Sequence, residues 1–144
     1  MSIMFSINQL VGRKIPEKNL REVFKKFLKT VGQKPSGVDI SLAIVDDKSI
    51  KQFNRIYRKK NEVTDVLSFN YGDKDNINGE ILISYPQAQK QAIKYKHLIK
   101  EEIQVLFAHG LLHLAGFKHN TIKSKAEMRR KEEEILGRGV CSRN

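Results

Sequence analysis

The sequence has little of several features that define other classes of protein. Its single cysteine, Cys141, cannot form an internal disulfide, which favours a reducing compartment. It contains no apolar run of about eighteen residues, the length that spans a membrane. In residues 1–12 the positive charges follow the apolar part instead of preceding it, so we expect no signal peptide. Repeats, low-complexity tracts and linkers are also missing, and we expect one cytoplasmic domain over residues 1–144.

Acidic side chains are few relative to basic ones. The chain has 16 Asp and Glu against 27 Lys and Arg, which gives a formal net charge of +11 and a pI near 9.8. The densest run of basic residues contains no acid: Lys48, Lys51, Arg55, Arg58, Lys59 and Lys60. A second basic region covers residues 13–34. Such surfaces attract polyanions and bind phosphate backbones without sequence preference. A solvated charged face has the same composition and is the alternative.

Hydrophobic periodicity predicts an α+β fold in which strands dominate the first part of the chain and helices the last part. A strand alternation occurs over 38–44, and a polar loop over 72–78 separates two short strands that we expect to pair as a hairpin. The predicted strands are 3–7, 38–44, 66–69 and 80–84, and the predicted helices are 16–31, 46–57, 86–96, 99–115 and 120–137. We therefore expect a small mixed sheet of about four strands packed with helices, one of which would carry a metal site.

Three histidines, His109, His113 and His119, lie close together in the sequence. A helix returns to the same face after about four residues, so His109 and His113 can aim their rings at a common point. Gly116 allows the chain to adopt a positive φ and to leave the helix, because glycine has no Cβ. The return of the chain can then bring His119 over the first two, and the spacing predicts three ligands for one metal ion.

The surroundings of these histidines favour a metal over ordinary burial. Residues 105–117 are apolar nearly all round, where an unpaired histidine would cost about 1–3 kcal/mol. Core histidines with hydrogen-bonded rings are the alternative. Three imidazoles that leave a fourth position to water are typical of a catalytic zinc site, whereas structural sites are closed and favour thiolates. Zn²⁺ is the expected ion, although nickel or copper can occupy the same geometry.

Four segments of the chain form a pattern: Tyr57-Arg58, TDVLSF at 64–69, GEILIS at 79–84 and HGLLHLAGFKH at 109–119. Read in this order, they resemble the YbeY family of bacterial rRNA maturation endoribonucleases. The resemblance implies a single-strand-specific, metal-dependent endoribonuclease that acts in 16S rRNA 3′-end maturation and in ribosome quality control. Its partners would be single-stranded RNA, 16S rRNA and the ribosome or its small subunit.

The resemblance also assigns roles to individual positions. His109, His113 and His119 match the family's zinc ligands, and Arg58 matches its conserved arginine implicated in activity. The chain departs from the family at three positions: Lys118 stands where aspartate is usual, and two milder changes place Val63 where proline is common and Glu80 where aspartate is usual. The planar guanidinium of an arginine can bind two phosphate oxygens at once, so Arg58 is the candidate to stabilise charge on the phosphate; its alternative is an ordinary surface arginine.

Other carboxylates and other functions remain open at this point. Asp65 and Glu80 are candidates for a general base or for a partner of a ligand histidine, and otherwise plain carboxylates at strand ends. The histidine spacing also matches the metzincin metalloproteases, but these place a glutamate after the first histidine, where this chain has Gly110. A third possibility is a non-catalytic, basic ribosome-assembly factor whose metal only holds the helix end in place.

Overall fold

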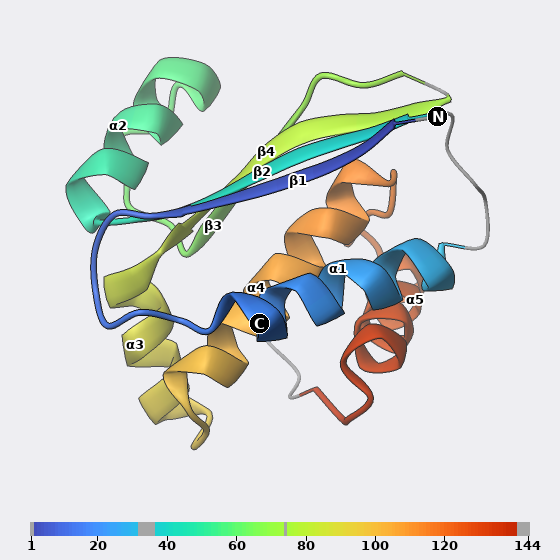
Figure 1. The fold of residues 1–144 in the computed structure, drawn as a ribbon. Helices are drawn as coiled ribbons and strands as arrows, with labels where there is room; N and C mark the ends of the chain where they lie inside the picture. The colour runs from blue at the N-terminus through green and yellow to red at the C-terminus, as the bar shows by residue number, and fades with distance from the viewer. Residues whose placement is uncertain (1, 32–36, 74, 141–144) are drawn as a thin grey trace.

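The protein is described by a computed structural model that covers residues 2–31, 37–73 and 75–140 (Figure 1). Cys141 and residues 32–34 of the second basic region lie outside the described residues. The elements in chain order are β1 (Ser2–Gln9), α1 (Glu17–Thr30), β2 (Gly37–Val45), α2 (Asp47–Arg58), β3 (Val66–Asn70), β4 (Asn76–Ser84), α3 (Tyr85–Lys94), α4 (Ile99–Leu114) and α5 (Ile122–Leu136). Each element expected from the sequence is present, which confirms the α+β class.

The four strands form one mixed sheet in the order β1-β2-β4-β3. Strand β2 pairs in parallel with both β1 and β4, while β3 and β4 pair antiparallel as the expected hairpin. Strand β4 is longer than expected and begins at Asn76, inside the segment predicted as a loop. The polar residues there join the sheet because they pair in register with the first half of β2, from Gly37↔Asn76 to Ile40↔Gly79. This long-range pairing overrides their weak intrinsic preference for strand.

The helices cover the two faces of the sheet unequally. Figure 1 shows α1, α4 and α5 on one side of the sheet and α2 on the other. The main core lies on the first side, where alternate residues of β2, such as Ile40 and Leu42, meet Phe27 of α1 and Phe107 of α4. A smaller cluster under α2 joins Ile50 to Leu67 and Leu82 of the hairpin. The hairpin is therefore held from both sides.

Helix α4 runs through the centre of the molecule. It packs against α1, α3 and α5 as well as β3 and β4, and ten of its sixteen residues are buried. It lies close to the sheet at Gly110, where an added Cβ would be only 3.0 Å from the side chain of Ile81. This packing fixes the distance of α4 from the sheet and its rotation about its own axis, and therefore the positions of its two histidines. Among the described residues, no helix is both long and apolar enough to cross a membrane.

Candidate metal centre

The last turn of α4 and the turn that follows it present the three histidines. His109 and His113 lie one helical turn apart, and the helix ends at Leu114. Gly116 has φ +97°, and the amides of Gly116 and Phe117 donate to the carbonyls of His113 and Leu112 at 3.0 Å. A Cβ at Gly116 would meet nothing within 4 Å, so the position needs glycine for its backbone conformation and not for space. The chain then turns back and brings His119 to the first two rings.

The three rings converge as the spacing predicted. One nitrogen from each ring lies within 4.8 Å of the other two, and the ring centroids are 4.6 to 5.2 Å apart. The Nε2 atoms of His109 and His113 are 3.1 Å apart. Two nitrogens bound at about 2.0–2.1 Å in tetrahedral geometry would be separated by about 3.3 Å, so the pair fits a Zn²⁺-sized ion with little adjustment.

The cluster is open on one side. His109 and His113 are half-buried and His119 is exposed. No further His, Cys, Asp or Glu from residues 2–31, 37–73 or 75–140 belongs to the group. A closed structural site would need a fourth protein ligand, so this donor set suits an ion that keeps a position for water or substrate.

Glu132 is a carboxylate that contacts a histidine of the cluster, and it was not among the candidates expected from the sequence. Its Oε1 lies 2.7 Å from Nδ1 of His109, and Glu132 itself is 7 % exposed, on α5. A hydrogen bond at Nδ1 holds the ring in the tautomer whose Nε2 lone pair faces the cluster. The sequence contained a signal, because Glu132 lies four residues after Met128 and three before Ile135, on the apolar face of α5.

The two carboxylates expected from the sequence as candidates for this role, Asp65 and Glu80, lie elsewhere. Asp65 accepts hydrogen bonds from the amide of Val66 at 2.8 Å and from the side chain of Gln91 at 3.0 Å, so it fixes the start of β3 against α3. Glu80 is exposed on β4 opposite Phe69. Glu132, which comes from a distant helix, therefore takes the place expected for one of them.

Burial favours the neutral form of two of the three imidazoles, those of His113 and His119. Burial lowers the pKa of His113 from 6.5 to about 4, and the neighbouring His109, His119 and Arg58 contribute to the shift. Burial also lowers the pKa of His119, with contributions from His109 and Lys125 that Glu132 partly opposes. A neutral imidazole has a free lone pair, which is the form that binds a metal ion.

Arg58 lies at the edge of the sheet beside the cluster. It is the last residue of α2, which ends because Lys59 adopts the left-handed conformation with φ 58°. The Nη2 atom of Arg58 donates to the carbonyl of Ser68 on β3 at 3.0 Å, and the side chain is otherwise exposed. Its charge is close enough to lower the pKa of His113. The structure thus brings Arg58 within electrostatic reach of His113, across a long stretch of sequence.

Gly110 bears on the metalloprotease alternative, and Lys118 is the position where the family usually has aspartate. A metzincin-type glutamate at position 110 would point into the side chain of Ile81, which is buried in the core, so the packing of α4 leaves no place for that general base. Lys118 is exposed to solvent, where its charge is screened. It lines a shallow hollow of about 360 Å³ together with Ser124 and Glu127 of α5.

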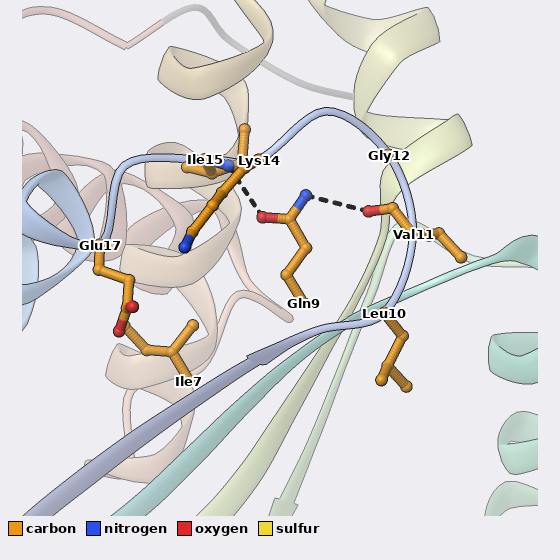
Figure 2. Close-up of a pocket in the computed structure, with 8 residues that line it drawn as sticks. All are labelled: Ile7, Gln9, Leu10, Val11, Gly12, Lys14, Ile15 and Glu17. Atoms are coloured by element: carbon orange, nitrogen blue, oxygen red, sulfur yellow. Dashed lines mark hydrogen bonds between the residues drawn. The ribbon is translucent and has the colours of Figure 1, made fainter.

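A pocket of about 450 Å³ lies away from the metal centre, between the end of β1 and the loop that leads to α1 (Figure 2). The side chain of Gln9 occupies its middle. Its Nε2 donates to the carbonyls of Val11 and Arg13, and its Oε1 accepts from the amide of Ile15 at 2.8 Å. These bonds use the polar groups of Gln9 to hold the loop, so we assign this pocket a structural role.

Comparisons with known proteins point to one family. The sequence model of the family described as Endoribonuclease YbeY matches residues 6–139. The chain is 39 % identical to Endoribonuclease YbeY of Desulforamulus reducens, over 92 % of this chain and 94 % of the relative. It is 34 % identical to the Bacillus licheniformis protein of the same name, over 100 % and 99 %. A Thermotoga maritima protein solved in solution has the same fold, with a TM-score of 0.64 and 26 % identity over 93 % of this chain and 90 % of that one.

Proposed function

The chain belongs to the Endoribonuclease YbeY family, whose members are RNA-cleaving hydrolases, and on this premise we propose that it is a zinc-dependent endoribonuclease specific for single-stranded RNA. We further propose that residues 1–144 form one catalytic domain that acts in the cytoplasm on 16S rRNA. Its tasks there would be 3′-end maturation and ribosome quality control, with the ribosome or its small subunit as partner. The observation that carries the proposal is the convergence of His109, His113 and His119 beside an exposed arginine.

The three imidazoles are the proposed ligands of one Zn²⁺. A set of three neutral nitrogen donors matches a catalytic zinc site, and Glu132 would orient His109 from behind. When bound, zinc supplies a Lewis acid that polarises a phosphoryl oxygen and makes water more acidic. Because the ligands are neutral, the full double charge of the ion would remain available to the phosphate.

Arg58 is the proposed phosphate-binding residue. One nitrogen of its guanidinium is held by the carbonyl of Ser68, which limits the movement of the side chain. The remaining exposed donors can bind a phosphate oxygen and stabilise the negative charge that develops there. The other basic residues of α2 and the turn after it, Lys51, Arg55, Lys59 and Lys60, are all exposed and would attract the backbone of the RNA.

The test is cleavage of a labelled single-stranded RNA that contains the 16S 3′-end sequence, compared with the same strand in a duplex. We expect the wild type to cut the single strand, and Arg58→Ala and His113→Ala to lose at least tenfold in rate, the effect of one transition-state contact of about 1.4 kcal/mol. Arg55→Ala is the matched control, since it removes an exposed arginine from the same helix. Circular dichroism of each variant checks that the fold is retained.

Two outcomes would refute the proposal. Unchanged cleavage by both variants would show that the reaction occurs elsewhere. Absence of cleavage by every protein, with zinc, nickel or manganese added, would favour a binding factor without catalytic activity. Peptide hydrolysis is disfavoured by the packing of Gly110, and an unfolded polypeptide that stays intact under the same conditions would exclude it.

A further inference from the structure

Two exposed tyrosines lie on the α2 side of the sheet, because Tyr57 contacts the ring of Phe69 and Tyr71, two residues after Phe69, shares its face of the hairpin. Tyr57 of α2 is 61 % exposed and Tyr71, just after β3, is 59 % exposed. The amide of Tyr71 donates to the carbonyl of Asn78 at 2.7 Å, which continues the hairpin ladder and fixes its position. Partial burial raises the pKa of Tyr71, and nearby Glu80 and Tyr57 raise it further, which places the two tyrosines within electrostatic reach of each other.

The ring of Tyr57 is supported from within the fold. It lies nearly parallel to Phe53, with centroids 5.9 Å apart and planes at 12°, and it meets Phe69 edge-on at 5.3 Å. Phe53 and Phe69 in turn pack on the small apolar cluster under α2. A large aromatic ring that is held by other rings and still mostly exposed has lost side-chain freedom without gaining burial. This is the arrangement expected of a preformed contact surface.

Arg58 connects these tyrosines to the metal centre. The bonds of Tyr71 to Asn78 and of Ser84 to Asp65 show that odd-numbered residues of the hairpin's first strand make its cross-strand hydrogen bonds. The carbonyl of Ser68 therefore points to the open edge of the sheet, where it accepts from Arg58. Tyr57 directly precedes Arg58, whose charge reaches His113. The tyrosines and Arg58 thus lie along the edge of the sheet formed by β3, and His113 is within electrostatic reach of Arg58.

We propose that Tyr57 and Tyr71 form a stacking platform for bases of single-stranded RNA, while the phosphate of the same strand binds at Arg58. The inference rests on the proposed function and names how the strand would be held. Aromatic rings beside a basic groove are the usual means of binding unpaired bases. Lys51, Arg55, Lys59 and Lys60, all exposed on or after the same helix, give the patch the charge that suits a polyanion and not an apolar protein partner.

The platform would also explain a preference for single strands. Bases in a duplex are stacked on one another and hydrogen-bonded, so their faces are not accessible to a tyrosine ring. Alanine substitution of a stacking residue weakens binding by about 5-fold to 150-fold, which corresponds to about 1–3 kcal/mol per base. Because both rings stay open to solvent, we expect a loss of about fivefold to tenfold for each.

The experiment measures binding by fluorescence anisotropy, with the protein as purified and two labelled strands of equal length. Both are 2′-O-methyl phosphorothioate strands, which resist nucleases; one carries bases and the other is abasic. Tyr57→Ala and Tyr71→Ala should each weaken binding of the base-carrying strand fivefold to tenfold and leave the abasic strand unchanged. Tyr57→Phe and Tyr71→Phe should bind as the wild type does. Ile93→Ala, which removes a 78 % exposed side chain from α3, is the matched control.

Three results would overturn the platform. They are a wild type that binds both strands equally, alanine variants that keep the full preference for bases, and alanine variants that weaken both strands alike. Cleavage assayed on the same preparations separates this inference from the proposed function. Base preference that depends on the tyrosines without RNA cleavage would reject only the catalytic role, whereas cleavage with a base preference independent of them would reject only the platform.

Discussion

Removal of the Glu132 carboxylate should weaken the metal site without touching a ligand. The side chain of Glu132 is 9 % exposed, and its Oε1 lies 2.7 Å from Nδ1 of His109, a distance typical of a charge-assisted hydrogen bond. Without this partner the ring of His109 can change tautomer or rotate, and its Nε2 is a weaker metal ligand. Loss of such a partner lowers metal affinity by about 10-fold to 100-fold, or about 1.4–2.7 kcal/mol.

The two substitutions at this position differ in what they leave behind. Glu132→Gln keeps an oxygen that can accept from Nδ1 but loses the charge, so we expect a loss near tenfold. Glu132→Ala leaves Nδ1 of the half-buried His109 without its acceptor, and we expect a loss near 100-fold. Glu134→Gln is the control, since Glu134 is exposed on the same helix and pairs only loosely with Lys131 at 3.7 Å.

The assay is competition for Zn²⁺ against a chromophoric chelator, with unfolding of the metal-free proteins measured in parallel. The expected order of affinity is wild type and Glu134→Gln first, then Glu132→Gln, then Glu132→Ala. The reasoning would be refuted if Glu132→Ala, shown to be folded, bound zinc as tightly as the wild type. It would also be refuted if Glu134→Gln lost as much affinity as Glu132→Gln.

Three further predictions concern packing, backbone conformation and pH. Gly110→Ala should lower the free energy of unfolding by about 1–3 kcal/mol in urea titrations, because its Cβ would press on Ile81. Gly116→Ala should cost about 1 kcal/mol and also weaken zinc binding in the competition assay, because φ +97° is strained for alanine and His119 follows this turn. In the metal-free protein the pKa of His113 is about 4, below its value of 6.5 when unfolded, so the unfolded chain binds more protons between these values. Urea unfolding should show stability falling as the pH decreases from about 6.5 to 4, and His113→Gln should reduce that slope.

The sequence predicted the elements well where its signals were local. The alternation of β2 and the apolar stripe of α1 need only the neighbours along the chain to be recognised, and both elements formed as expected. The loop predicted over 72–78 extends too far toward Glu80, because β4 already begins at Asn76. Asn76 joins the sheet only through its distant partner Gly37. A polar strand of this kind has no local signal, so its pairing depends on what the rest of the fold places beside it.

The candidate metal site was likewise predictable from the sequence only in part. The spacing of His109, His113 and Gly116 determined by itself that three imidazoles could meet, because helix geometry and the conformational freedom of glycine act over one or two turns. Only the tertiary structure decided what surrounds them. Glu132 reaches His109 because α5 packs beside α4, and Arg58 reaches the cluster because the end of α2 binds the open edge of β3. Contacts between residues so far apart in sequence depend on how whole elements pack, which no local pattern encodes.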